Sequence, residues 1–385
     1  MKRIEVLDGL RGLAVLIVFL SHTSGRDQSI AGFLNFHGIG HIGVYLFFTL
    51  SAFLLGLGLF SKPLSSQNIK SFFIKRVLRI APLYYIIVSG VFLVQIIYSN
   101  YSTKYLHVSN GLNGYLEHIY FYRGDGVFWS IVSEMQFYLI VPILGWILLK
   151  FKRKGIIILL LIAILNFALY LMKYAGINDY LLYVSPNTLQ RGTFIDIFIP
   201  GLIMAYLVQS KMDFLKSNEK LIHKIANVSL IFGGILTVAL VSKNFLGINQ
   251  PLYHFRFLSM FFGTAFSIIT LSLYIKNDFL NDLFKRKFLR FIGKIGFSFY
   301  LIHMAVFEII NKTDLHHTLK FLTSLTIILI VSSITYYLIE KPSIRLSYWI
   351  INKFKLSPTK NKRIKTTVYS KRCSALQKTN LDFKK

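Results

Sequence analysis

The stretch RGLAVLIVFLSH, residues 11–22, places ten apolar or small residues between an arginine and a histidine. About 20 apolar residues form a helix that crosses the hydrocarbon of a bilayer, and such runs recur along almost the whole chain. Of the 385 residues, 54% are hydrophobic and only 16% are charged, and the mean hydropathy is +0.55. This composition excludes a soluble globular protein and predicts an all-α fold, a polytopic membrane helix bundle.

Ten membrane spans with short connections are predicted. They lie at 8–24, 38–60, 78–98, 128–149, 155–175, 192–209, 225–242, 254–275, 293–311 and 319–339. An even number of spans puts both termini on one side of the membrane. With both termini in the cytoplasm, the inside segments hold 34 of the 44 Lys and Arg residues, as the positive-inside rule requires. The net charge of +28 is therefore a topology signal, and no nucleic-acid partner is expected.

Two ionisable residues of the first span share one helical face. The step from Arg11 to His22 advances about 16 Å along a helix and turns about 1100°, which is close to three full turns. Ionisable groups inside a membrane usually face a polar interior or a water-filled path, so the pair fits a channel through the bundle. Two other interpretations stay open: an Asp8–Arg11 ion pair at the headgroups, and a His22 that only caps the outer end of its helix.

Arg76 and Arg79 stand three residues apart at the inner end of the third span. Guanidinium groups suit phosphate oxygens, so this helical face is a candidate site for an anionic group at the cytoplasmic rim. The alternative is ordinary positive-inside charge without a specific ligand.

The fourth span begins at the outer interface with Trp129, and Glu134 follows about one and a half turns later. A carboxylate at that depth needs a partner, and His22 is expected at a similar depth. The two residues are candidates for an acid–base pair in which imidazole is the general base. A structural polar contact between helices is the alternative. Trp129 and Ser133 are candidate substrate-binding residues.

Other polar residues of the spans are weaker candidates for binding an acceptor substrate. Arg191 and Asp196 open the sixth span, where they either bind an acceptor or neutralise each other within the helix. Tyr300 and His303, together with Ser298, either line a pore in the ninth span or hydrogen-bond to other helices.

Metal and thiol chemistry are not expected. His37 and His41 have a spacing that a metal can use, but they have no carboxylate pattern nearby. The lone cysteine, Cys373, lies in the predicted cytoplasmic tail, which excludes a cysteine nucleophile in the core. The composition predicts a membrane domain over 1–345 and a polar, basic and largely disordered tail over 346–385, next to anionic lipid.

Six segments follow the order seen in integral-membrane acyltransferase family 3, the bacterial O-acyltransferases of the O-antigen and exopolysaccharide acetylase type. They are LDGLRGLAVLIVFLSH, GVYLFFTLSAFLL, FFIKRVLRIAPLYY, WSIVSEMQFYL, GKIGFSFYLIH and YYLIEKPSIR. The chain resembles this family over about residues 5–345. Met135 replaces the second glutamate of the family's usual pattern, Tyr45 stands where an aspartate is common, and Ala52 stands where a glycine is common.

The resemblance implies a membrane acyltransferase of the bacterial cytoplasmic (inner) membrane. It would move an acyl group, expected to be acetyl, from cytoplasmic acyl-CoA to a hydroxyl of a cell-surface or lipid-linked carbohydrate such as lipopolysaccharide. In this scheme His22 and Glu134 are catalytic, and Arg11, Arg76 and Arg79 hold the acyl-CoA. Acetyl-CoA is then a co-substrate, and no permanently bound cofactor is expected.

Expected partners are membrane lipids, acyl-CoA, the carbohydrate acceptor and, as further candidates, glycan-assembly proteins. A competing class is a polytopic transporter or flippase of a glycan or acyl precursor, in which intramembrane Arg, His and Glu would serve gating or coupling. A second rival is a bundle without catalytic activity in a glycan-assembly complex.

Overall fold

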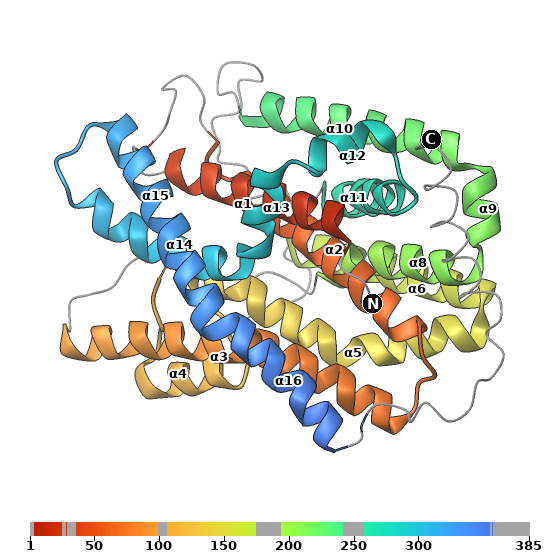
Figure 1. Ribbon diagram of the computed structural model, residues 1–385, viewed down its shortest axis with the longest axis horizontal. Coiled ribbons are helices and arrows are strands. Elements are labelled where there is room, and N and C mark those ends of the chain that lie inside the picture. Colours follow the sequence, from red (N-terminus) through yellow and green to blue (C-terminus); the bar gives the residue numbers. More distant parts are fainter. Residues whose placement is uncertain are drawn as a thin grey trace, which may run out of the picture.

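The computed structural model describes residues 4–24, 28, 36–98, 106–174, 194–241, 258–354 and 356, and every regular element among them is helical (Figure 1). The longer helices are α1 (Glu5–Ser24), α2 (Gly40–Phe60), α3 (Ser66–Ile97), α5 (Trp129–Phe151), α6 (Arg153–Tyr174), α8 (Ile195–Ser210), α10 (Glu219–Val241), α11 (Ser259–Tyr274), α14 (Gly296–Asn311) and α15 (His317–Thr335). The shorter helices are α4 (Gly111–Ile119), η1 (Gly126–Phe128), α9 (Met212–Ser217), α12 (Asp278–Phe284), α13 (Lys287–Lys294), η3 (Tyr336–Glu340) and α16 (Lys341–Lys353). The predicted all-α class is confirmed for the part of the chain described.

Each of the ten predicted spans overlaps one of the longer helices. Within the described residues, six segments are long and apolar enough to cross a membrane: α1, α2, α3, η1 with α5, α6, and the run from α15 through α16. The α13–α14 pair, bent by 78°, makes a seventh if it is one span. α8 and α11 are apolar but have only 16 residues each. The described residues therefore show six or seven membrane-capable helices, and the expected count of ten is not confirmed.

α2 is surrounded by other helices, since it contacts α1, α5, α8 and α11. Its buried side chains come from every face of the helix, as expected for a helix inside a bundle. α1 lies between α2 and the α12–α13 segment (Figure 1). The first span is therefore an interior helix, with neighbours able to receive its polar side chains.

The close approach of α1 and α13 depends on glycine. A Cβ atom on Gly12 would collide with the carbonyl oxygen of Leu289, and one on Gly293 would collide with that of Asp8. The two helices therefore pack backbone against backbone, as small residues allow inside membranes. This packing brings Arg11 of α1 and Lys294 of α13 to the wall of one cavity.

The C-terminal helices pack against α3. α15, the π-helical segment η3 and α16 follow one another without a break, and α16 contacts α3 (Figure 1). The predicted boundary after residue 345 falls inside α16, which continues to Lys353. Beyond Phe354, Leu356 is the one described residue of the predicted tail, and Cys373 lies outside the described residues.

A short helix that the sequence analysis did not predict, α4, contacts α3. Leu112, Leu116 and Tyr120 are exposed at helical spacing, whereas Gly114 and His118 are buried. Amphipathic helices with an exposed apolar face lie in the plane of the membrane interface. α4 therefore fits a position at the bilayer surface, beside the start of α5.

Candidate active site

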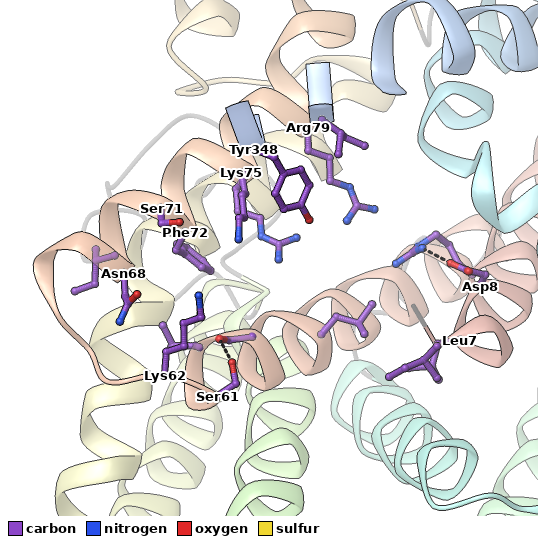
Figure 2. Close-up of a pocket in the computed structure, with 18 of the residues that line it drawn as sticks. Leu7, Asp8, Ser61, Lys62, Asn68, Ser71, Phe72, Lys75, Arg79 and Tyr348 are labelled. Carbon is purple, nitrogen blue, oxygen red and sulfur yellow. Dashed lines mark hydrogen bonds and ion pairs between the residues drawn. The ribbon is translucent and has the colours of Figure 1, made fainter. Parts of the chain in front are cut away.

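One end of the bundle encloses a cavity of about 670 Å³, which we call the inner cavity. Its walls come from the start of α1, the end of α2, the connection to α3, α3 itself, α13, η3 and α16. Figure 2 shows Arg79, Lys75 and Lys62 directed toward the same space. The charged residues that line it are Asp8, Arg11, Lys62, Lys75, Arg76, Arg79, Lys294 and Glu340.

The positive charges of the inner cavity outnumber its carboxylates by six to two. Asp8 Oδ1 lies 3.1 Å from Arg11 Nη1, so the i, i+3 pair forms, but it lines the cavity. Neither Arg76 nor Arg79 forms an ion pair with any carboxylate in the described part of the chain. Arg76 Nε is buried without a hydrogen-bond partner there. Guanidinium groups left in this state suit an incoming polyanion such as a nucleotide phosphate.

A second, narrow cavity of about 60 Å³ adjoins the inner one. Arg11 and Arg79 line both of them. At its other side, Val44 and Tyr300 line both the narrow cavity and a third one. The three cavities thus form a series beside α1 in which neighbours share lining residues, and we call this series the polar path.

Glu134 of α5 lines the narrow cavity together with Arg11 and Arg79. Its Oε1 accepts a 2.5 Å hydrogen bond from Ser51 Oγ of α2 and a 2.6 Å hydrogen bond from Tyr138 OH of α5. Two hydroxyl donors therefore fix the carboxylate where it balances the charge of the arginines, an arrangement that fits a polar residue inside a membrane.

The third cavity, the outer cavity, has a volume of about 560 Å³ and lies at the end of α1 and the starts of α2, α5 and α8. Four histidines line it: His22, His37, His41 and His107. The indole of Trp129 forms part of the wall, 5.6 Å from the His41 ring between centroids. Within the described residues, these and the other candidate ligands form no group of three or more with a metal-binding arrangement.

His22 and Glu134 line different cavities. The carboxylate of Glu134 bonds to Ser51 and Tyr138, so the expected direct pair with His22 is replaced by these hydroxyl contacts. The ring of His22 instead lies 5.2 Å from the ring of His303 between centroids. His303 is buried, and its Nδ1 lies 2.5 Å from the carbonyl oxygen of Tyr300.

The candidate polar residues of the ninth span divide between cavity and packing. Tyr300 lines the narrow and outer cavities, and its hydroxyl donates to the Val127 carbonyl at 3.0 Å and accepts from Ser130 Oγ at 2.7 Å. Ser298 is buried and donates to Glu340 Oε2 at 3.1 Å. Ser298 therefore joins α14 to η3, whereas Tyr300 faces the path.

Of the remaining candidate residues, Ser133 and Asp196 do not line the outer cavity with His22. Ser133 donates to the carbonyl oxygen of Trp129 at 2.9 Å and lines a different, apolar cavity. Asp196 is fully buried and accepts from Ser259 Oγ at 2.9 Å, a contact that joins α8 to α11. Arg191 lies outside the described residues.

Several residues of the path were not candidates from the sequence. Ser51 and Tyr138 sit inside apolar motifs, where a hydroxyl gives little signal of its own. In the sequence, Lys62 and Lys294 are indistinguishable from ordinary positive-inside charge, and Tyr348 falls in the predicted tail. Only the packing of α2, α13 and α16 brings them to these cavities.

The turn before α5 carries a buried polar cluster at the outer cavity. His118 Nδ1 lies 2.8 Å from the Gly114 carbonyl, and its Nε2 accepts from the Asp125 amide at 3.0 Å, a pattern that requires the neutral imidazole. Burial lowers the pKa of His118 below its usual value of 6.5. Burial alone would raise the pKa of Asp125, but hydrogen bonds from the Ser109 amide and from Arg123 outweigh it and lower that pKa.

Comparison with known proteins places the chain in one family. Two relatives are named O-acetyltransferase OatA, from Staphylococcus aureus strains NCTC 8325 and COL; each is 24% identical over 370 residues, which is 87% of this chain. The chain spans 56% of the length of these relatives. No solved structure matches the chain. A family model described as an acyltransferase domain (Acyl_transf_3) matches residues 4–339. The chain therefore belongs to the Acyl_transf_3 family of membrane acyltransferase domains.

Proposed function

We propose that the protein is a membrane O-acetyltransferase that takes acetyl-CoA into the inner cavity and delivers the acetyl group to a carbohydrate hydroxyl in the outer cavity. One observation carries the proposal: a cavity with an excess of cations and a cavity that holds His22 both share lining residues with the same narrow cavity. Family membership and the names of the two relatives support the reaction class.

The donor's phosphates would bind the inner cavity. Neither Arg76 nor Arg79 forms an ion pair with a carboxylate in the described residues, and Lys62 and Lys75 also line the cavity. Bidentate arginine contacts are among the stronger hydrogen bonds to phosphate. A nucleotide with several phosphates fits this array better than a neutral or cationic solute.

The thioester would pass Arg11 and Glu134 to reach His22. The distance to cover along α1 is about 16 Å for eleven residues, which a slender arm such as pantetheine can span whereas a nucleotide cannot enter a cavity of about 60 Å³. The nucleotide would therefore stay in the inner cavity, and only the pantetheine arm with its thioester would enter the narrow cavity.

His22 would act as the general base. It takes the proton of an acceptor hydroxyl as the oxygen attacks the thioester carbonyl carbon; the carbon–sulfur bond then breaks, and the imidazolium returns the proton to the leaving thiolate. A positioned base of this kind contributes about 10²–10⁴-fold to the rate, and alignment of the two substrates supplies the remainder.

The proposal also includes the orientation of the protein in the membrane and the membrane in which it lies. The inner cavity would face the cytoplasm of a bacterial inner membrane, with both termini there and with ten crossings. The positive-inside distribution of Lys and Arg supports this orientation. Membrane lipids and glycan-assembly proteins would be its partners, and acetyl-CoA a co-substrate rather than a resident cofactor.

The test measures CoA release and acetyl transfer by purified protein in nanodiscs. His22→Ala is expected to lose at least about 100-fold in kcat with unchanged size-exclusion behaviour. His316→Ala is the matched control, because His316 is an exposed histidine outside the three cavities; it should retain full activity. Wild-type activity in His22→Ala would contradict the proposal.

The same preparation separates an enzyme from a transporter. A flippase or transporter would move a solute across proteoliposomes without releasing CoA from acetyl-CoA, and its His22→Ala variant would change flux only. A bundle without catalytic activity would show neither CoA release nor flux.

A further inference from the structure

A fourth cavity, distinct from the polar path, lies between α4, α5 and α8. We call it the lateral groove; its volume is about 770 Å³. Its floor is apolar and buried, formed by Phe137, Phe194 and Phe198. Its rim is exposed, with Leu116 at 41%, Tyr120 at 77% and Leu139 at 66% of their maximal accessibility.

The groove opens toward the bilayer. Leu139 belongs to α5, part of a membrane-capable segment, and exposed apolar side chains on such a segment face lipid. Tyr120 and Tyr122 at its upper rim are residues that concentrate at the level of the headgroups. From Ser133 to Ile140, both on its wall, α5 advances about 10 Å. The groove therefore begins at the interface and runs down into the hydrocarbon.

Polarity changes along the groove. The polar lining residues lie on α4 or on the part of α5 next to it: Asn113, Glu117 and Gln136. The apolar lining residues that lie further along α5 and α8 are Phe137, Ile140 and Phe198. The carboxylate of Glu117 is 3.7 Å from Arg123 Nη1, and Arg123 lines the outer cavity. An occupant would thus meet polar groups at one end and only apolar ones at the other.

The groove and the outer cavity adjoin at one aromatic side chain. Phe194 lines both, and its ring lies 4.9 Å from the ring of Trp129 between centroids. Trp129 in turn lines the outer cavity with His22. A molecule with a polar head at His22 and its apolar chain in the groove would therefore have to pass beside Phe194.

We infer that the lateral groove holds the hydrocarbon chain of a lipid-linked acceptor, while the sugar of the same molecule enters the outer cavity. The inference rests on the proposed function and narrows its acceptor to an amphiphile that arrives from the membrane. Apolar area buried in the groove lowers the free energy of the bound chain, and the wall at Phe194 sets the position of the head relative to His22.

The test compares acceptors that differ only in their chain. Methyl and dodecyl glycosides of glucose, galactose, mannose, rhamnose and N-acetylglucosamine are supplied with acetyl-CoA to protein in nanodiscs. For any sugar that is acetylated, the dodecyl form should have a KM lower by about tenfold or more, because several methylenes are buried. Equal KM values for the two forms would overturn the inference.

Two tryptophan substitutions on α5 locate the effect. Ile140→Trp fills the groove and should abolish the preference for the dodecyl glycoside without changing the KM for acetyl-CoA. Ile143→Trp is the matched control, since Ile143 is 60% exposed on the same helix and does not line the groove; it should keep the preference. A preference that survives Ile140→Trp would also overturn the inference.

A measurement without turnover completes the design. A dodecyl glycoside that carries a diazirine on its chain is photolysed with the protein, and labelled peptides are mapped by mass spectrometry. Saturable labelling of α4, α5 and α8, displaced by dodecyl but not by methyl glycoside and lost in Ile140→Trp, supports the groove; unsaturable labelling spread over the lipid-facing helices contradicts it. Absence of CoA release with every acceptor would instead contradict the proposed function, and the labelling would still decide on the groove.

Discussion

Ser51 Oγ donates a 2.5 Å hydrogen bond to Oε1 of Glu134 and so joins α2 to α5 at the narrow cavity. The second donor to this oxygen is Tyr138 OH at 2.6 Å. Arg11 and Arg79 line the same cavity. The carboxylate thus has fixed hydroxyl partners and nearby guanidinium charges, which makes it a charge-balancing residue of the path.

Loss of the charge at Glu134 should slow transfer more than loss of one of its hydrogen bonds. We expect Glu134→Gln to lower kcat by about 100-fold, because the arginines then lack their counter-charge in a low-dielectric site. Tyr138→Phe removes one donor of two and should cost about tenfold. Thiol release from acetyl-CoA measures both values. Wild-type kcat in Glu134→Gln would refute the role of its charge.

Arg76 should act on donor binding rather than on chemistry. Arg76→Gln is expected to raise the KM for acetyl-CoA by about tenfold or more with little change in kcat, since a charge-assisted contact to phosphate is lost. Arg76→Lys should restore only part of the affinity, because an ammonium group cannot bind phosphate in two places. Lys70→Gln is the control: Lys70 is exposed on α3 and does not line the cavity. An equal rise in KM in Lys70→Gln would indicate that the overall positive charge, and not a specific contact of Arg76, binds the donor.

The turn before α5 should weaken in acid. The folded pKa of His118 is below 6.5, so the unfolded chain binds the proton more readily, and stability present above pH 6.5 falls as the pH drops below that value. The lowered pKa of Asp125 adds a further loss only below about its usual 3.8. Thermal unfolding between pH 7.5 and 4.5 should show the first step, at a cost of about 1–3 kcal/mol. His118→Gln should flatten it; an unchanged pH profile in that variant would assign the step to other groups.

Gly293 should tolerate no side chain. Gly293→Ala brings a Cβ against the carbonyl oxygen of Asp8, so α1 and α13 must separate, and overpacking of this kind costs about 1–3 kcal/mol. The variant should unfold at a lower temperature and lose donor affinity, because Arg11 and Lys294 move apart. Gly90→Ala is the matched control on α3, where a Cβ meets open space. Equal thermal stability of the two variants would contradict the packing.

The sequence predicts which charged residues meet at the site better than it predicts which helices contact one another there. Arg11, Arg76 and Arg79 meet at one cavity because helical spacing and the positive-inside rule both place them at the same end. The expected contact between Glu134 and His22 does not form. Similar depth in the membrane does not determine which helices touch, and Glu134 bonds to Ser51 of α2 instead of to a residue of α1.

Long-range packing explains the other differences. The polar, basic sequence around Tyr348 predicts a disordered tail, yet α16 continues to Lys353 and lies against α3. The lateral groove depends on α4, a helix of nine residues that is too short to stand out as a membrane span. No local sequence pattern predicts that Phe194 lines both the lateral groove and the outer cavity, because its position results from how α8 packs beside α5.

The most direct test of the central claim is the sidedness of the reaction. Sealed proteoliposomes, sorted by an added N-terminal tag that reports orientation, receive acetyl-CoA on one face and a glycoside acceptor on the other. Acetyl transfer is expected only when acetyl-CoA is on the face of the inner cavity, and no transfer is expected after His22→Ala. Transfer that requires acetyl-CoA on the face of the outer cavity, or that proceeds equally from either face, would contradict it.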